Sequence, residues 1–280
     1  MPQTILRYDM RQPVFSSTPR ADMYAAAIEQ CAWGEKNGIG SVHLSEHHGS
    51  EDGYCPSPLV FAAAIAARTE HLMMYISALI APLHDPVQLA EDLVVLDHIS
   101  RGRVFPVLSG GYREEEFRSL GKTLAERKTY MDEIGPFLEQ AWQGETFQHG
   151  ERTVTITPTP HSQPRPPILM GGSSRPAARR AARHADFFIP SGPEIFEMYR
   201  EELKALGKPD PGPMPQAPST VHFLAEDPDA YWAQIAPHVQ HETNMYAKWA
   251  GQAGVHSPFL HCDVTVELSF RNQRLAPVPL

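Results

Sequence analysis

Cysteine is scarce in this sequence: three residues among 280, at positions 31, 55 and 262, and no Cys-x-x-Cys pair. So few and scattered thiols predict no disulfide framework and fit a reducing compartment. The first ten residues lack the basic start and apolar core of a signal peptide. No apolar run approaches the roughly 20 residues that a bilayer crossing needs. We therefore expect a cytoplasmic protein without a membrane segment.

Positive charge is also in deficit. The formal net charge is -9, so a nucleic-acid partner is not expected. The one basic cluster consists of four arginines at helical spacing: Arg175, Arg179, Arg180 and Arg183. Such spacing is typical of a solvated helix face, and nucleic-acid contact is the less favoured alternative.

Apolar stretches alternate with amphipathic ones along the chain. Strands are expected at residues 4–10, 38–48, 71–82, 103–111, 166–174, 185–192 and 219–226. Helices are expected at residues 22–37, 58–70, 87–100, 113–143, 175–184, 194–206 and 228–249. Residues 145–158 predict a hairpin that turns at His149 and Gly150. Seven strand–helix repeats over residues 1–252, with no break in composition, predict one α/β domain over residues 1–280.

Two features favour a TIM-type (β/α)8 barrel over an open doubly wound sheet. No Gly-x-Gly-x-x-Gly follows the first strand, as a dinucleotide-binding unit would require. Polar residues and glycines follow several strands, in the stretches SEHH, SGGYR, GGSS and PSG. A barrel gathers such strand ends on its catalytic face.

The stretch SEHH places Glu46, His47 and His48 at the end of the second expected strand. It could be a metal site, an acid–base site or the polar rim of a pocket. Neighbouring strand residues point to opposite faces, so one ion cannot readily take both histidines, and no metal site is expected. One histidine should line the mouth as a hydrogen-bonding or acid–base group, unless both are structural.

The stretch GGSSRP has the chemistry of an anion site. Gly171 and Gly172 permit close backbone approach, Ser173 and Ser174 can donate, and the following helix directs free N–H groups to the same place. Phosphate is the usual occupant of such a turn. The alternative is a plain helix cap with glycine serving only the turn.

A second glycine-rich turn, LSGGYR, follows the fourth expected strand. It holds Gly110, Gly111 and Arg113 directly before a helix. Arg113 could bind a phosphate through its guanidinium fork. It could equally pair with Glu116 or Glu126 on the helix surface.

Together these stretches resemble the luciferase-like family of flavin-dependent oxidoreductases. The resemblance lies in residues 45–72, 81–121 and 166–188, which occur in the family's order. It implies a TIM barrel that holds a flavin-type cofactor at the carboxyl ends of its strands. His47 falls on the family's active-site histidine beside the cofactor ring.

The resemblance also assigns backbone positions. The Ser77–Ala78 bond falls where family members bend the third strand under the ring, often through a non-proline cis peptide. Gly172, Ser173 and Ser174 match the family's phosphate-binding turn.

The sequence departs from the family pattern in two places. Gly110 stands where bacterial luciferase has a phosphate-contacting arginine, so Arg113 would have to substitute or the phosphate would be held differently. After Trp249 no helix pattern follows, and residues 262–270 alternate like a strand with one wet face. Residues 253–280 are therefore an unusual closing unit, or the barrel is open or completed by a partner subunit.

The resemblance implies an FMN-type monooxygenase that uses O2 and takes reduced flavin from a separate reductase. The alternative cofactor is the deazaflavin coenzyme F420, which transfers hydride, and a second alternative is a non-catalytic flavin-binding protein. A homodimer is expected. Tyr54, Leu79 and Phe188, which the pattern places near the mouth, hint at a small, mostly apolar substrate.

Overall fold

The computed structural model describes residues 4–214, 223 and 225–254. The chain divides into two compact units, residues 1–214 and residues 215–280, and each is described by itself. The first unit contains the sheet and most of the helices. The expectation of one domain over residues 1–280 stays a prediction.

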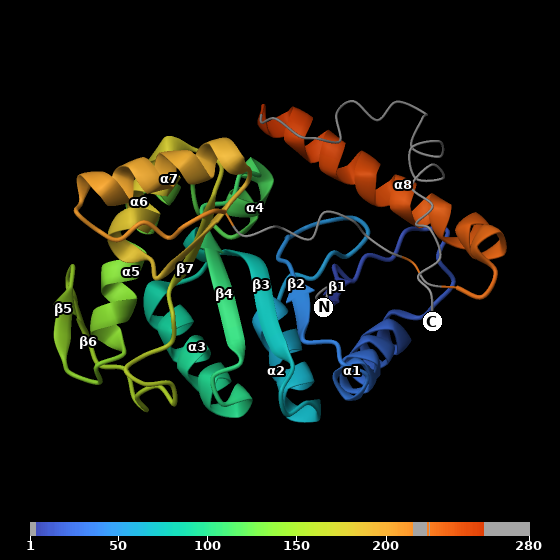
Figure 1. Ribbon diagram of the computed structural model, residues 1–280, viewed down its shortest axis with the longest axis horizontal. Helices are drawn as coiled ribbons and strands as arrows, with labels where there is room; N and C mark the ends of the chain where they lie inside the picture. Colours follow the sequence, from blue (N-terminus) through green and yellow to red (C-terminus); the bar gives the residue numbers. More distant parts are fainter. Residues whose placement is uncertain (1–3, 215–222, 224, 255–280) are drawn as a thin grey trace. The chain divides into compact units, whose positions relative to one another are not determined.

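Six parallel strands form the sheet of the first unit, in the order β1-β2-β3-β4-β7-β8 (Figure 1). Their bounds are Ile5–Tyr8 (β1), Ser41–Leu44 (β2), Met73–Ile80 (β3), Val104–Ser109 (β4), Leu169–Gly172 (β7) and Phe187–Pro190 (β8). Spatial order equals chain order, as in a barrel, whereas a doubly wound sheet reverses direction. Within the described part of the chain, β1 and β8 are the two edges of this sheet.

The helices follow the strands in alternation. Their bounds are Arg20–Lys36 (α1), Pro58–Arg68 (α2), Pro86–Ser100 (α3), Glu114–Ser119 (α4), Arg127–Ala141 (α5), Arg175–His184 (α6) and Pro193–Ala205 (α7). Short 3-10 turns lie at Ala81–Leu83 (η1) and Leu124–Glu126 (η2). Helix α1 packs on α2, α2 on α3, α3 on α5, α5 on α6 and α6 on α7. This succession is that of the outer helical ring of a barrel.

Local sequence signals explain where α3 begins and ends. Asp85 caps it through its carboxylate, which accepts a hydrogen bond of 2.9 Å from the N–H of Val87, and Pro86 is the first helical residue. At the other end Arg101 and Gly102 adopt positive φ, the left-handed conformation that terminates helices.

The second strand is shorter than expected. The prediction of strand up to His48 is wrong, because β2 ends at Leu44. Beyond that point the backbone N–H of His47 donates to the carbonyl of Cys55, in the following loop, and not to a neighbouring strand. Residues 45–48 are therefore loop, and strand alternation does not set the directions of the two histidines.

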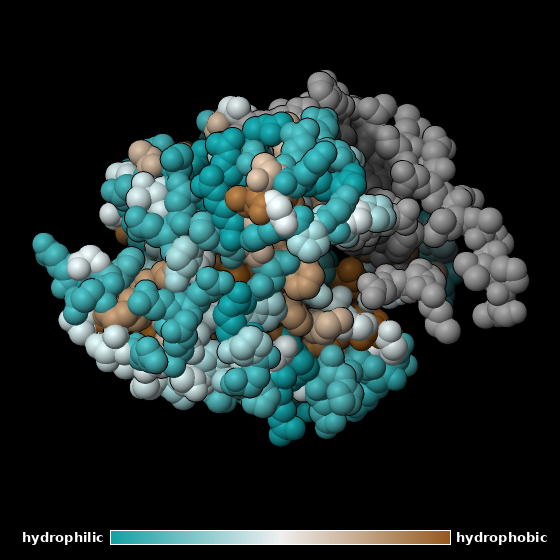
Figure 2. Space-filling model, turned by 60° about the vertical axis from the view of Figure 1, so that its left-hand side comes forward, coloured by the Kyte–Doolittle hydropathy of each residue, from teal (hydrophilic) through white to brown (hydrophobic). Residues whose placement is uncertain are grey.

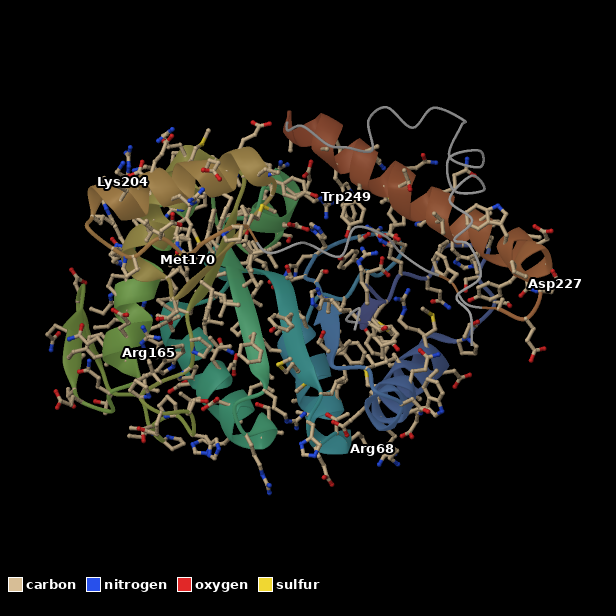
Figure 3. All side chains as sticks on the ribbon, viewed as in Figure 1. Arg68, Arg165, Met170, Lys204, Asp227 and Trp249 are labelled. Carbon is tan, nitrogen blue, oxygen red and sulfur yellow. The ribbon has the colours of Figure 1, made fainter. Side chains whose placement is uncertain are left out.

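The core lies against the central strands. Val42 and Leu44 of β2 and Met74 and Ile76 of β3 are fully buried, and Met170 of β7 is 1% exposed (Figure 3). The residues that alternate with them are half-buried: His43, Tyr75 and Phe105 form a row of ring contacts across three strands, each 5.1 Å between ring centroids.

The expected hairpin is confirmed as strands β5, Phe147–His149, and β6, Arg152–Val154, with Gly150 at positive φ in the turn. In the second unit, α8 covers Pro228–Ala253 and is capped by Asp227. The strand expected at residues 219–226 falls largely, and the pattern at 262–270 wholly, outside the described residues. None of the described helices has the length and apolarity of a membrane span. The face drawn in Figure 2 is mostly hydrophilic, with hydrophobic residues in small groups.

Candidate functional site

The residues expected to act together follow the carboxyl ends of neighbouring strands. Residues 46–48 follow β2, Ser77 and Ala78 lie near the end of β3, and residues 110–113 follow β4. Residues 171–174 span the end of β7 and the two residues after it. Because these strands are parallel and adjacent, their carboxyl ends meet at one edge of the sheet. The fold therefore brings the expected site residues to the same edge.

A buried carboxylate fixes the side chain of His47. Glu116 lies in α4, and its Oε1 atom is 2.8 Å from Nδ1 of His47 and 3.0 Å from the backbone N of His48. The side chain of Glu116 is fully buried and His47 is 7% exposed. The ring of His47 also meets the ring of Tyr54 edge-on, with 4.8 Å between centroids. Its position is thus set from two sides.

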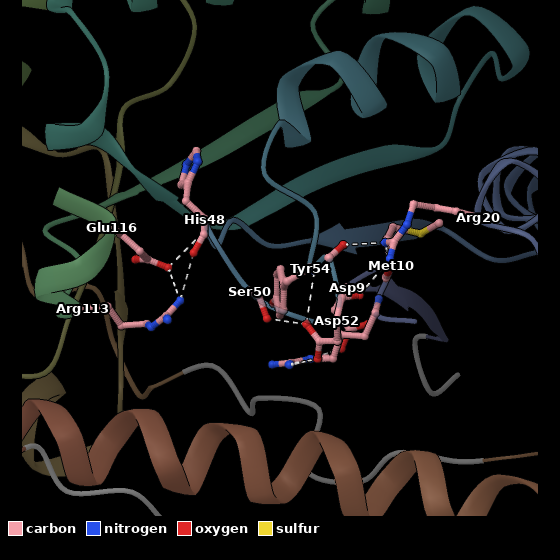
Figure 4. A network of polar contacts seen from close by, with 11 residues as sticks. Asp9, Met10, Arg20, His48, Ser50, Asp52, Tyr54, Arg113 and Glu116 are labelled. Atoms are coloured by element: carbon pink, nitrogen blue, oxygen red, sulfur yellow. Dashed lines mark hydrogen bonds and ion pairs between the residues drawn. The ribbon is translucent and has the colours of Figure 1, made fainter. Parts of the chain in front are cut away.

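Arg113 takes part in the same cluster. Its Nη1 atom donates to Oε1 of Glu116 at 2.7 Å and to the carbonyl of His48 at 3.2 Å (Figure 4). Arg113 and Glu116 do pair, as one alternative from the sequence had it. The pair is buried beside His47, however, whereas the sequence placed it on the helix surface. The role of Arg113 at a phosphate stays a prediction.

A second buried carboxylate holds His48. Oε1 of Glu46 lies 2.9 Å from Nε2 of His48 and 2.9 Å from Nε2 of His84, and Oε2 accepts from the N–H of Ile80 at 2.5 Å. Burial by itself would raise the pKa of Glu46, but these hydrogen bonds outweigh it and the pKa is lowered. Glu46 is therefore an anion that ties the loop after β2 to the end of β3.

The loop after His48 is anchored by arginines. Nη1 of Arg11 lies 2.6 Å from Oδ2 of Asp52, and its guanidinium stands over the Tyr54 ring at 4.6 Å. Arg20 donates to the carbonyl of Gly53 at 2.9 Å (Figure 4). Tyr54 thus contacts both the cation of Arg11 and the ring of His47.

The bond between Ser77 and Ala78 is a cis peptide, as the resemblance implied. The pairing of β3 with β4 shifts register between Ser77 and Leu79. Both residues are half-buried, while Leu79 is fully buried.

The β7 turn is tightly built. A Cβ on Gly172 would lie 2.3 Å from Cβ of Ala177, so the backbone approaches α6 as only glycine allows. Ser173 and Ser174 are exposed, and Ser174 caps α6 without a side-chain hydrogen bond. Two exposed hydroxyls therefore stand directly before the N-terminus of α6, the kind of position at which anions bind.

Arg127 is a residue that the sequence did not single out. Its Nη1 donates to the carbonyl of Gly111 at 2.8 Å, and its stem lies beside Gly110. Throughout the described chain no carboxylate pairs with its guanidinium, whereas Arg175 pairs with Glu201. The only signal in the sequence was Gly110, which stands where the family pattern has a phosphate-contacting arginine. It indicated that another residue would have to supply the positive charge.

The expectations about the substrate and about a metal stay predictions. Tyr54, Leu79 and Phe188 are all buried, and Phe188 packs against Tyr199. Among the described His, Cys, Asp and Glu side chains, no group of three could hold a metal ion.

A family model described as luciferase-like monooxygenase matches residues 10–259. The chain belongs to this family. The order of its strands and of its helices is that of a (β/α) barrel.

Two relatives show the range of the family. The chain is 28% identical over 176 residues to the oxygenase component of flavin-dependent trigonelline monooxygenase from Acinetobacter baylyi, covering 61% of this chain and 47% of the relative. It is 28% identical over 200 residues to F420-dependent glucose-6-phosphate dehydrogenase from Nakamurella multipartita, covering 68% and 56%. The chain thus spans about half the length of the curated relatives it matches.

Solved structures confirm the fold. Monooxygenase RslO1 from Streptomyces bottropensis is similar with a TM-score of 0.74 and 20% identity, over 90% of this chain and 80% of that one. The oxygenating constituent of 3,6-diketocamphane monooxygenase from Pseudomonas putida, in complex with FMN, is similar with a TM-score of 0.67 and 20% identity, over 94% and 82%. The predicted TIM-type α/β class is confirmed.

Proposed function

We propose that this chain is a flavin-dependent oxidoreductase, an FMN-type monooxygenase that takes reduced flavin from a separate reductase. The observation that carries the proposal is the position of His47, which is fixed by Glu116 and lies at the same edge of the sheet as the β7 turn. One site could then bind both parts of a flavin, with the ring beside His47 and the phosphate at the β7 turn.

Features of the described residues fit a ring cofactor with a phosphate tail. The Oε2 atom of Glu116 is buried and has no hydrogen-bond partner in the described structure, so it can accept from a donor that enters the site. Gly172 and the hydroxyls of Ser173 and Ser174 would form the anion turn, and Arg127 would supply a cation that pairs with no carboxylate among the described residues.

Each group has a defined task under this proposal. The cofactor would supply two-electron chemistry with O2. His47 would accept or donate a proton beside the ring, the cis segment at Ser77 and Ala78 would lie under it, and Gly110 and Gly111 would let it approach the end of β4. Arg127, Arg113 or both would offset the phosphate charge, with Gly171–Ser174 as the turn that receives it. A homodimer and a small, mostly apolar substrate belong to the same proposal.

The second candidate uses coenzyme F420 and transfers hydride. It is favoured by the match to the F420-dependent dehydrogenase over 68% of this chain. His47 would then act on the oxygen of the substrate.

Binding and oxygen uptake test the proposal. We expect the chain to bind reduced FMN under anaerobic conditions and to consume O2 with a substrate faster than free reduced flavin does. His47→Ala should remove that excess. Tight binding of F420 with none of FMN would replace the proposal by the second candidate. Uptake no faster than free flavin, and unchanged by His47→Ala, would leave a non-catalytic flavin-binding protein.

A further inference from the structure

The two adjacent histidines present opposite ring nitrogens to buried carboxylates. His47 contacts Glu116 through Nδ1, and His48 contacts Glu46 through Nε2. His84 also contacts Glu46 through Nε2. In a neutral imidazole only one nitrogen carries a proton, and the hydrogen bond that the ring makes decides which one.

The Oε1 atom of Glu116 can only accept hydrogen bonds. Nη1 of Arg113 and the backbone N–H of His48 are obligatory donors, and both reach Oε1 of Glu116. An oxygen that accepts from two such donors carries no proton of its own. The contact of 2.8 Å to Nδ1 of His47 therefore places the imidazole proton on Nδ1.

The same reasoning gives the opposite result at Glu46. The N–H of Ile80 donates to Oε2, and the pKa of Glu46 is lowered in spite of its burial. The two imidazoles that meet Oε1 therefore donate from Nε2.

We propose that Glu116 is a positioning residue that holds neutral His47 with its proton on Nδ1, while Glu46 holds His48 and His84 with theirs on Nε2. Nε2 of His47 is then its acceptor nitrogen. In the neutral ring, Nε2 of His47 accepts a hydrogen bond from a hydroxyl or N–H group. It can donate one only after it has itself been protonated. The meaning of this for a bound cofactor rests on the proposed function, whereas the tautomers themselves do not.

The ring nitrogens can be observed directly. In 15N-labelled chain without cofactor, at a pH where the imidazoles are neutral, long-range 1H–15N spectra distinguish a protonated from an unprotonated ring nitrogen. His47→Asn, His48→Asn and His84→Asn assign the three rings by loss of their signals. We expect protonated Nδ1 in His47 and protonated Nε2 in His48 and His84. A wild-type His47 protonated mainly on Nε2 overturns the proposal.

Three neighbouring glutamates provide matched variants. Glu114, Glu115 and Glu116 are consecutive, but only Glu116 is buried. Glu116→Leu removes the acceptor, and His47 should shift to the Nε2 tautomer that free imidazoles prefer, while Glu116→Gln, which keeps an acceptor oxygen, should preserve the Nδ1 form. Glu115→Leu should change nothing. A Glu116→Leu spectrum in which His47 stays protonated on Nδ1 refutes the role of Glu116.

Failure of this proposal and failure of the proposed function are separable. The wild-type and Glu116→Gln spectra decide the tautomer even if Glu116→Leu does not fold. If the tautomers are as expected but oxygen uptake with the chain is no faster than with free flavin, only the proposed function is refuted. If the enzyme is active but His47 is protonated on Nε2, only the role of Glu116 is refuted.

Discussion

Glu116 Oε1 lies 2.8 Å from Nδ1 of His47, although 69 positions separate the two residues in the chain. The pairing joins the loop after β2 to helix α4 beyond the end of β4. A carboxylate behind a histidine fixes the direction of the ring and the nitrogen that it offers. The chemistry available at His47 therefore depends on α4 being in place.

Arg127 is expected to serve the phosphate and not the ring of a flavin. Arg127→Met should weaken binding of FMN about tenfold to hundredfold, because a charge-assisted hydrogen bond contributes about 1.5–3 kcal/mol. Riboflavin, which has no phosphate, should bind unchanged, as fluorescence titration of both flavins would show. The control is Arg179→Met, since Arg179 is exposed and paired with Glu202. Equal losses for both flavins would contradict the assignment.

Arg113 should behave differently, because its guanidinium is buried against Glu116. Arg113→Met leaves a buried carboxylate with one donor fewer, a change that costs about 3–5 kcal/mol when a buried pair is broken. We expect a lower free energy of unfolding in urea and weaker binding of FMN and riboflavin alike. A loss confined to FMN would instead make Arg113 the phosphate residue.

Gly172 is expected to tolerate no side chain. In Gly172→Ala the new Cβ would meet Cβ of Ala177 at 2.3 Å, and such overpacking costs about 1–3 kcal/mol. Thermal unfolding should show a lower Tm, and FMN should bind more weakly because the turn must open. Gly40→Ala is the control, since nothing lies within 4 Å of a Cβ there. An unchanged Tm for Gly172→Ala would mean that the turn is not tightly packed on α6.

Glu46 should stabilise the fold in a pH-dependent way. Its pKa in the folded chain is below the ordinary value of 4.5, so its contribution is fully present above that pH and is lost as the pH falls through the lowered pKa. At pH 7, Glu46→Gln should lower the free energy of unfolding by about 1–3 kcal/mol. The difference from wild type should shrink below about pH 4.5.

Urea unfolding at several pH values measures this difference. Glu51→Gln, at an exposed position in the same loop, is the matched control and should follow the wild-type curve. A difference for Glu46→Gln that stays constant down to pH 3 would show that the Glu46 carboxylate is not preferentially ionised in the folded chain.

Much of the fold follows from local sequence signals. Apolar stretches bounded by caps and glycines marked the six described strands and their helices, and Asp85 with Pro86 marked the start of α3. Such signals involve only neighbouring residues, so they can be read from the sequence without knowledge of the tertiary contacts. They failed at the end of β2, where a backbone hydrogen bond from His47 to Cys55 in the following loop replaces strand pairing.

The sequence also located the ends of the strands where a site had to lie, and the resemblance selected His47 and the Ser77–Ala78 bond. It did not show which of three consecutive glutamates is buried beneath His47, or that His48 and His84 share Glu46. Nor did it show that Arg127 lies against Gly111.

These choices belong to the tertiary structure for one physical reason. A local pattern reports what a segment can form, whereas the partner of a buried charge is whichever group the fold brings within hydrogen-bond distance. Glu114, Glu115 and Glu116 are chemically identical, and only the packing of α4, whose Phe117 contacts Ile80 at the end of β3, decides that the third is buried.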